Sequence, residues 1–365
     1  MSSLYGNSIK ISIFGQSHSD SIGVVIDGIP AGEELDLEKL RAYTARRAPA
    51  NNSLGTPRKE ADEFEILSGV ANGKFCGAPF AAAIKNTNVK PGDYSEFSDK
   101  PRPGHADFTA GVKYFGANDF SGGGHFSGRL TAPLCIAGGI CAQILERRGI
   151  YIAAHHERIG EVTDTRFDAR TVSKADFDAL CVQRLTVINE SVLEKMEAEI
   201  ENAKAQKDSV GGVIECAAIG LPVGLGDPMF DGMENRIAKA VFAVPGVKGI
   251  EFGVGFDCAK LRGSENNDPF MYENGRVVTE TNNHGGILGG ITSGMPLIFR
   301  AAMKPTPSIF KEQKTVSLSE KSDTSLSIKG RHDPCIAVRA LACIEAAAAV
   351  AIYDALLDYN KTNKI

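Results

Sequence analysis

The chain has 365 residues, 43% of them hydrophobic, which is enough to bury a large core and excludes a disordered or fibrous protein. Its 40 Lys and Arg residues against 45 Asp and Glu residues give a formal net charge of −5, so the chain as a whole has no field that attracts nucleic acid. Glycine is abundant, at 39 residues, but follows no collagen period, so it must act at particular backbone positions.

The first ten residues are polar and lack the apolar stretch of a secretory signal. The longest uncharged apolar run, 130–145, is shorter than the ~20 residues that a membrane span needs. The eight cysteines form no CxxC pair and mostly lie in apolar runs, which favours buried free thiols in a reducing compartment over disulfides or a zinc site. We therefore expect a soluble, cytoplasmic protein that binds neither membranes nor nucleic acid.

In chain order, the first predicted elements form a pattern that returns later. A β-rich run that closes with a Gly-Ile-Pro or Gly-Leu-Pro turn precedes a helical pattern and then a strand with a glycine turn. The three segments are 21–32, 37–47 and 63–70 in the first copy, and 209–224, 233–244 and 248–255 in the second. Duplication is the interpretation that we prefer, and chance similarity of two β-α-β segments remains the alternative.

Three further helices are predicted. The patterns at 130–147 and 334–357 are apolar almost all round, which is typical of helices at the centre of a large protein. The pattern at 191–207 is charged, with a narrow apolar stripe, and indicates a solvent-facing helix that connects the two halves. No Pro- or Ser-rich linker divides the chain, so independent domains are not expected.

Five of the seven histidines lie in short segments rich in Gly, Ser and Arg. Glycine lets a backbone approach a ligand, while histidine and arginine supply proton transfer and positive charge. Together the segments predict one composite site; they are 15–19, 102–107, 122–129, 282–286 and 330–334. His155 and His156 end a predicted strand and favour a surface position.

Positive charge is concentrated near these segments. The stretch 41–60 carries a local charge of +4, for which a solvated basic loop is the alternative to an anion site. Arg129 follows a triple glycine and precedes an apolar helix, where helix-terminal N–H groups favour anions.

Several familiar chemistries have no motif in the chain. It contains no GxxxxGK[ST], GxGxxG, HExxH or GxSxG sequence. His18, His105 and His125 have Arg, Gly and small polar neighbours rather than a clear ligand set, so no metal is expected.

The histidine motifs resemble those of the chorismate synthase family, in the same order and across about residues 6–352. The motifs are Gly15-Gln16-Ser17-His18, Arg102-Pro103-Gly104-His105-Ala106-Asp107 with Lys113-Tyr114, Gly122-Gly123-Gly124 with Ser127-Gly128-Arg129, Lys304-Pro305-Thr306, and Gly330-Arg331-His332-Asp333-Pro334-Cys335.

The resemblance implies an α+β fold, a β-α-β sandwich with central helices between antiparallel sheets and two pseudo-symmetric halves. We expect one domain over residues 1–365, with halves at about 1–160 and 208–360 and a charged helical connector at 161–207. The implied activity is a 1,4-anti elimination of phosphate from 5-enolpyruvylshikimate 3-phosphate, which gives chorismate in the shikimate pathway to aromatic amino acids. The enzyme would be a lyase that needs reduced FMN, and family members are typically homotetramers.

The resemblance also assigns roles. His18 would protonate the leaving phosphate, His105 would act on the reduced flavin near N1, and Asp333 would assist proton removal through flavin N5. The matching arginines would contact substrate or NADP at Arg47 and Arg129, and flavin at Arg331. The positions that would line FMN are His125, Phe126, Ser127, Gly246, Gly289, Lys304, Pro305, Thr306, Pro307 and Ser308. Capping roles for His18 and His105, and an N-cap role for Asp333 before a helix that starts at Pro334, remain alternatives.

The chain departs from the family pattern at several positions. Gln16 replaces an acidic residue, His125-Phe126 replaces a frequent Arg-Ser, Leu130 replaces a Glu, and Ser53 stands where many members have arginine. NADPH is a possible reductant, but without a nicotinamide fingerprint we expect reduced flavin from an external flavin reductase. A non-catalytic flavin- or anion-binding paralogue is the alternative, although such a protein would not need His18, His105 and Asp333.

Overall fold

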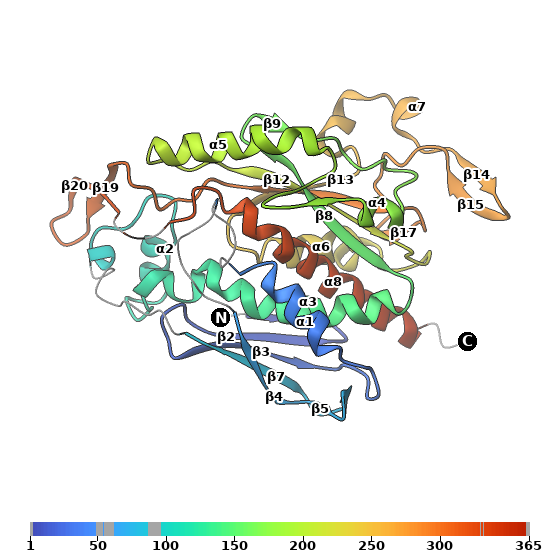
Figure 1. The fold of residues 1–365 in the computed structure, drawn as a ribbon, viewed down its shortest axis with the longest axis horizontal. Helices are drawn as coiled ribbons and strands as arrows, with labels where there is room; N and C mark the ends of the chain where they lie inside the picture. The colour runs from blue at the N-terminus through green and yellow to red at the C-terminus, as the bar shows by residue number, and fades with distance from the viewer. Residues whose placement is uncertain are drawn as a thin grey trace.

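The computed structural model of the chain describes residues 3–48, 54, 62–86, 96–328, 330 and 332–362. Within these ranges two five-stranded sheets enclose a pair of helices, α3 (Thr131–Glu146) and α8 (Ala337–Thr362) (Figure 1). The predicted α+β sandwich, with central helices between antiparallel sheets, is confirmed.

The neighbouring strands of both sheets pair antiparallel. Along the first sheet the order is β1 (Leu4–Tyr5), β2 (Lys10–Gly15), β3 (Ser21–Asp27), β7 (Phe80–Lys85) and β4 (Phe64–Ser68). Along the second it is β13 (Val247–Phe252), β18 (Leu297–Met303), β12 (Gly212–Ile219), β8 (Tyr151–Ile159) and β9 (Val162–Thr163). β-branched residues at alternate positions of β3, Ile22, Val24 and Ile26, bury one face of the first sheet in the core.

The two sheets share a topology. β3 and β4 both pair with β7 and are joined through α1 (Leu37–Ala45), while β12 and β13 both pair with β18 and are joined through α6 (Met233–Val241). The segments that echo one another in the sequence thus hold equivalent places, and duplication remains our interpretation. The predicted first half, 1–160, ends inside the second sheet, because β8 pairs with β12.

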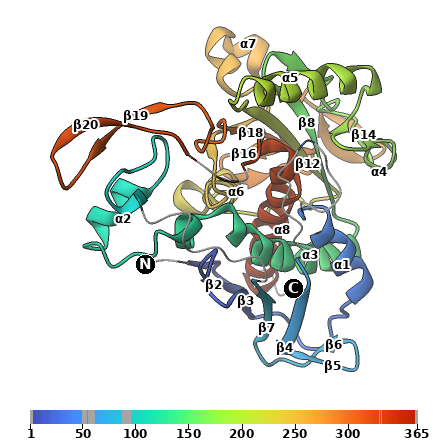
Figure 2. The same cartoon turned by 60° about the vertical axis from the view of Figure 1, so that its left-hand side comes forward.

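The central helices are apolar over most of their surface because they pack on each other and on the sheets, α3 mainly on the first sheet and α8 on the second (Figure 2). By length and composition, Gly128–Glu146 and Ala337–Lys361 are each suited to cross a membrane. However, 89% and 94% of the residues in their most apolar windows are buried inside the protein, as in core helices. The two predicted core helices are therefore confirmed.

The remaining elements lie outside the two sheets and the central helices. The predicted connector 161–207 is helical only in part: it holds α4 (Lys174–Asp178), β10 (Cys181–Val182), β11 (Thr186–Val187), η5 (Glu190–Val192) and α5 (Leu193–Ala205). The buried side chains of α5 form the predicted narrow stripe of Leu193, Met196 and Ile200.

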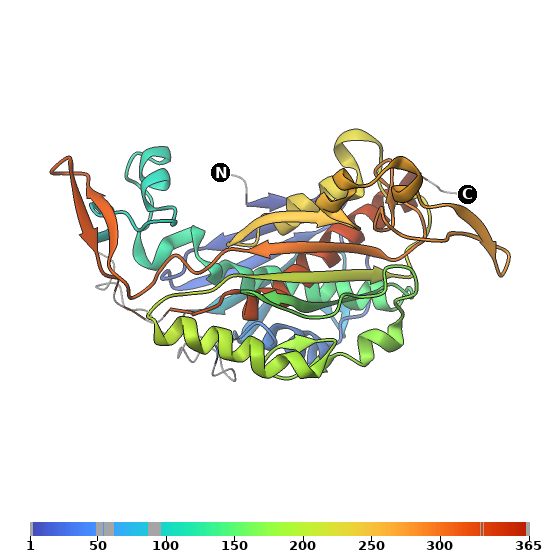
Figure 3. The same ribbon diagram turned by 90° about the horizontal axis from the view of Figure 1, so that it is seen from above.

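Short elements extend from the two ends of the molecule. At one end lie α2 (Asp107–Lys113) and the hairpin of β19 (Gln313–Ser317) and β20 (Ser322–Leu326) (Figure 3). At the other lie α7 (Gly263–Asn266) and the hairpin of β14 (Phe270–Glu273) and β15 (Arg276–Thr279). The other short elements are β5 (Val70–Ala71), β6 (Lys74–Phe75), β16 (Ile287–Leu288), β17 (Ile291–Thr292), η3 (Ser121–Phe126), η4 (Gly128–Leu130), η6 (Met229–Asp231) and η7 (Gly255–Lys260).

The predicted surface position of His155 and His156 is wrong. Both lie inside β8 and are buried, because residues 164–188 cover this part of the second sheet. His155 Nε2 lies 2.9 Å from the Glu215 carboxylate and its Nδ1 lies 3.3 Å from Asp164. Burial alone would lower the pKa of His155, but the two carboxylates raise it above the usual value. His155 therefore serves as a buried counter-charge for Asp164 and Glu215. Glu215 comes from a different strand, β12.

Candidate active site

A cavity of about 520 Å³ is lined in part by the residues that lead into α2. Its walls come from the loop before α2, the glycine-rich turn before α3, the loop before β13, the end of β18 and the first turns of α8. The volume is typical of ligand sites, which span about 300–1,000 Å³. The predicted site residues that line it are Arg47, His105, His125, Phe126, Ser127, Arg129, Gly246, Lys304, Thr306, Pro307, Ser308 and Asp333.

Two of the predicted arginines share one buried carboxylate. Arg47 and Arg129 each pair with a different oxygen of Asp62, and all three side chains are almost fully buried. Arg47 Nε also donates to Thr131 Oγ1 at 2.9 Å, and Arg129 Nε donates to Asn86 Oδ1 at 3.2 Å. Burial alone would raise the pKa of Asp62, but the two guanidinium groups hold it below its usual range. The carboxylate therefore stays ionised, and the cluster keeps a net positive charge at the cavity wall.

His105 is oriented by a second buried ion pair. Asp107 Oδ1 lies 2.8 Å from His105 Nδ1, while both carboxylate oxygens accept hydrogen bonds of 2.7 Å from Arg102. Burial would raise the pKa of Asp107, but the hydrogen bonds from Arg102 and His105 hold it far below its usual value. An ionised carboxylate only accepts hydrogen bonds, so Nδ1 of His105 carries the proton that Asp107 accepts. The other ring nitrogen, Nε2, takes no part in this contact.

The triple glycine separates His105 from His18. Gly122 has φ of +61°, and a Cβ atom there would lie 2.1 Å from His18 Cε1. Gly123 has φ of +100°, and a Cβ atom there would lie 3.0 Å from His105 Cε1. Only glycine allows this backbone to run between two imidazole rings. His18 lies behind this turn, beside Gly122, and is not itself among the residues that line the cavity.

The opposite wall presents bare backbone and cations. Gly246 has φ of +100°, and a Cβ atom there would lie 2.5 Å from the Ile336 side chain. The Gly246 carbonyl accepts the Lys304 N–H at 2.9 Å, while Lys304 Nζ donates to the Gly104 carbonyl at 2.5 Å. Burial, and then the charge of Lys248, lower the pKa of Lys304.

The same wall contains a buried hydroxyl group. Thr306 Oγ1 is buried, lines the cavity and has no hydrogen-bond partner among the described residues. Buried polar atoms are almost always paired, so the orphaned hydroxyl fits a bound group that carries a polar edge. The departure from the family pattern at residue 125 is also accommodated, because the His125 ring lies 2.7 Å from both Ser3 Oγ and the Gly15 carbonyl.

Asp333 belongs to the cavity rather than to a helix cap. α8 begins at Ala337, not at Pro334, and Asp333 accepts a hydrogen bond of 3.2 Å from Arg339 Nη1. Arg339 Nε in turn donates to the Arg47 carbonyl at 3.1 Å. Burial, followed by the charge of Arg47, lowers the pKa of Arg339. The acid and the arginine cluster are thus connected through one guanidinium group.

The comparisons with known proteins agree with the motifs. The family model described as chorismate synthase matches residues 9–357. The chain belongs to the chorismate synthase family. The chorismate synthase of Thermococcus kodakarensis is 46% identical over 352 residues, which cover 96% of this chain and 97% of that protein. That of Lancefieldella parvula is 45% identical over 370 residues and covers 98% of this chain and 97% of its own. A crystal structure of chorismate synthase superposes with a TM-score of 0.75 at 26% identity, over 97% of this chain and 93% of that one.

Some residues expected from the chorismate synthase resemblance lie elsewhere. Gly289 lies in the turn between β16 and β17, near the Leu297 end of β18, whereas the cavity lies at the Met303 end. His284 lies near the same end of β18, paired with Asp268. The prediction that all five histidine segments form one site within the chain is therefore wrong for segment 282–286. Pro305 is not among the lining residues, and Arg331 and Ser53 lie outside the described residues.

Four important residues were missed as site residues. Arg102 and Asp107 stand in a quoted motif, so their spacing from His105 was a usable signal. Arg339 was visible as a cation in an apolar helix, which indicates a paired charge. Asp62 had no distinguishing signal among the acidic residues around it.

Proposed function

We propose that this protein is a lyase that converts 5-enolpyruvylshikimate 3-phosphate into chorismate and phosphate by 1,4-anti elimination, with reduced FMN as cofactor. The observation that carries the proposal is the cavity itself, in which a family member gathers an oriented histidine, an acid and a buried cationic cluster. The shikimate pathway follows from the family name.

The cationic cluster suits the leaving group. Expulsion of phosphate from an allylic carbon requires cations that hold its charge and an acid that protonates it. In this proposal Arg47 and Arg129 hold the phosphate, and Asp62 fixes the two guanidinium groups at the right separation. His18, on the other side of the Gly122 turn, is the proposed acid.

The residues of the opposite wall fit a flavin. The bare backbone at Gly246 admits a flat ring, the Thr306 hydroxyl offers an unused polar atom, and Lys304 offers charge to a phosphate, with His125 beside it on the cavity wall. When bound, reduced FMN supplies electron density for the elimination and a ring nitrogen that takes up a proton. His105 is proposed to act on the reduced flavin near N1. Asp107 is its positioning residue.

Asp333 is proposed to help remove the substrate proton. Its carboxylate lies on the cavity wall and is tied to Arg339, so its direction is fixed. Because Arg339 also binds the Arg47 backbone, removal of the proton and departure of the phosphate take place on one connected scaffold.

The remaining expectations belong to the same proposal. We propose a cytoplasmic homotetramer that receives reduced flavin from an external reductase. NADPH as a direct reductant is tested separately below.

The experiment is an anaerobic assay with chemically reduced FMN and the enolpyruvyl phosphate, which follows both phosphate and chorismate. Formation of the two products in equal amounts supports the proposal, and bound flavin without product would instead identify a binding-only paralogue. Oxidised FMN with and without NADPH forms the second arm and tests self-reduction. His105→Ala and His18→Ala should each lower the rate by about 10²–10⁴ while the protein keeps its melting temperature. Unchanged turnover would return that histidine to a structural role.

A further inference from the structure

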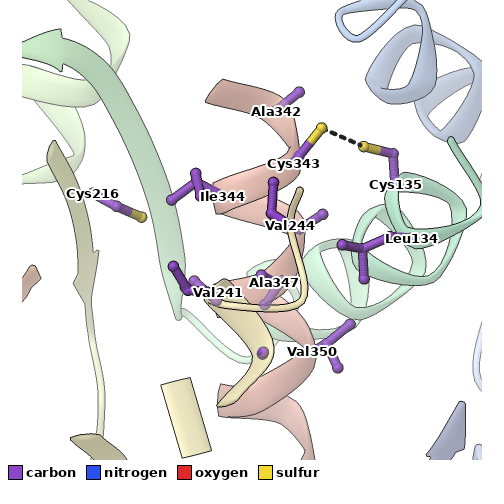
Figure 4. Packing of buried hydrophobic residues seen from close by; sticks show 14 of the residues in the cluster. Leu134, Cys135, Cys216, Val241, Val244, Ala342, Cys343, Ile344, Ala347 and Val350 are labelled. Atoms are coloured by element: carbon purple, nitrogen blue, oxygen red, sulfur yellow. Dashed lines mark hydrogen bonds between the residues drawn. The ribbon is translucent and has the colours of Figure 1, made fainter. Parts of the chain in front are cut away.

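Two cysteines meet between the central helices, directly beneath the cavity. Cys135 of α3 and Cys343 of α8 lie with their sulfur atoms 3.9 Å apart, and both side chains are buried (Figure 4). Cys343 also lines the cavity, whereas Cys135 lies behind it. The proposed elimination uses neither thiol.

The two helices approach each other closely beside these cysteines. One turn after each cysteine come Gly138 and Ala346, and a Cβ atom on Gly138 would lie 2.3 Å from the Ala346 Cα. Only glycine permits this separation of the two backbones. A disulfide requires Cα atoms about 4.4–6.8 Å apart, a distance that helices usually reach only where small residues let them touch.

The surroundings of Cys343 favour the thiolate. The hydrogen bond from Cys135 lowers the pKa of Cys343; burial opposes this, and Arg47, Thr131 and Arg339 support it. The pKa of Cys135 is raised, first by the hydrogen bond to Cys343 and then by burial. Burial likewise raises the pKa of Cys141, farther along α3, so burial alone does not make a thiol of this protein reactive.

We propose that Cys343 is a peroxide-sensitive thiol of the cavity and that its oxidation links it to Cys135 as a reversible disulfide. The three features that point to this are the short separation of the sulfur atoms, the guanidinium groups of Arg47 and Arg339 near Cys343, and the place of Cys343 in the cavity wall. Reactive cysteines occur in such electropositive sites, often with a second cysteine in reach.

The chemistry balances with hydrogen peroxide as the oxidant. The Cys343 thiolate attacks peroxide, the O–O bond breaks, and a sulfenic acid and hydroxide form; the hydroxide becomes water with one proton. The Cys135 thiol then attacks the sulfenic sulfur, so that the S–S bond forms, the S–O bond breaks and a second water leaves with the thiol proton. Two thiols lose two electrons in total and peroxide gains them. The proposed function adds a local source of peroxide, because reduced flavin reacts with dioxygen, but the thiol chemistry does not depend on that source.

The link would alter the site above it. The sulfur atoms must move from 3.9 Å to about 2 Å, which shifts the first turns of α8 toward α3. The same turn carries Arg339, which binds Asp333 and the Arg47 backbone, and the Cys343 sulfur lies 3.4 Å from the Arg339 carbonyl oxygen. We therefore expect the disulfide to reduce turnover by the proposed enzyme and a thiol reductant to restore it.

The test uses the native, full-length protein, treated with increasing hydrogen peroxide, blocked with an alkylating agent and digested with trypsin without reduction. We expect a disulfide-linked pair of the peptides 130–147 and 340–361, which disappears after treatment with dithiothreitol. Peptide 130–147 contains both Cys135 and Cys141, so Cys141→Ser is the matched control and should retain the link, while Cys135→Ser should lose it. Oxidation of the exposed Cys76 and Cys258 without this link would overturn the proposal.

A second measurement isolates the first step. In Cys135→Ser the sulfenic acid cannot be resolved, so a dimedone adduct should accumulate on Cys343 and on neither Cys141 nor Cys216. A folded Cys135→Ser protein that takes up no dimedone at Cys343 would also overturn the proposal. Both readouts are masses of peptides, so they hold whether or not the protein catalyses the proposed elimination.

Discussion

Asp62 places one carboxylate between the guanidinium groups of Arg47 and Arg129, and all three side chains are buried. The substitution Asp62→Asn keeps the shape of this side chain but removes its charge. The amide oxygen still accepts from one arginine, whereas the NH₂ group faces the other arginine as a donor. Two buried cations are then left without a counter-charge.

Loss of one partner from a buried ion pair costs about 3–5 kcal/mol of the free energy of unfolding. The unfolding entropy is about 2.1 cal/mol/K per residue near the melting temperature, or roughly 0.8 kcal/mol/K for 365 residues. The expected fall in melting temperature is therefore about 4–6 °C.

Thermal unfolding of wild type and Asp62→Asn, followed by circular dichroism, measures this shift. The control is Asp178→Asn, which removes the exposed partner of Lys174 and should leave the melting temperature unchanged. Inorganic phosphate should raise the melting temperature of Asp62→Asn more than that of wild type, because the two arginines at the cavity wall then lack a counter-charge and attract an anion more strongly. A variant that melts within about 1 °C of wild type, with no added response to phosphate, would refute the bridging role.

Three further outcomes follow from the geometry. Asp333→Asn should slow turnover much more than it lowers the melting temperature, because the residue lies before the start of α8 and the amide oxygen can still accept from Arg339; a loss of stability as large as that of Asp62→Asn would instead assign it a structural role. Gly246→Ala should weaken FMN binding, measured by quenching of flavin fluorescence, because a left-handed backbone costs other residues about 1–2 kcal/mol and the methyl group would collide with Ile336; unchanged affinity would contradict the assigned wall. The pKa of His155 is raised, so the stability that it contributes is complete below about pH 6.5 and is lost as the pH rises through the folded-state pKa. The difference in melting temperature between wild type and His155→Gln should accordingly shrink as the pH rises above about 6.5, and a constant difference would argue against a protonated His155.

The sequence predicted much of the fold because several signals are local. An apolar pattern all round a helix can be satisfied only inside a protein, so the segments that form α3 and α8 identified themselves as core. The glycines at 122–124 were also a local signal, because glycine alone adopts a left-handed backbone at little cost. All three have positive φ in the structure. The motif histidines and arginines likewise indicated an anion-binding, acid–base site before any geometry was known.

The tertiary structure decided which charges and thiols meet. Asp62 lies 67 residues before Arg129, His155 lies 60 residues before Glu215, and Cys135 lies 208 residues before Cys343, yet each pair is in contact. No local sequence pattern marks such partners. A buried charge needs a counter-charge, and tertiary packing decides which distant residue supplies it. Tertiary packing also places His284 and Gly289 near the Leu297 end of β18, away from the cavity, although their glycine-rich context resembled that of the other motifs. The sequence by itself determined which helices form the core and which residue types the motifs supply. The packing of the two sheets around those helices determined which of these residues meet at the cavity.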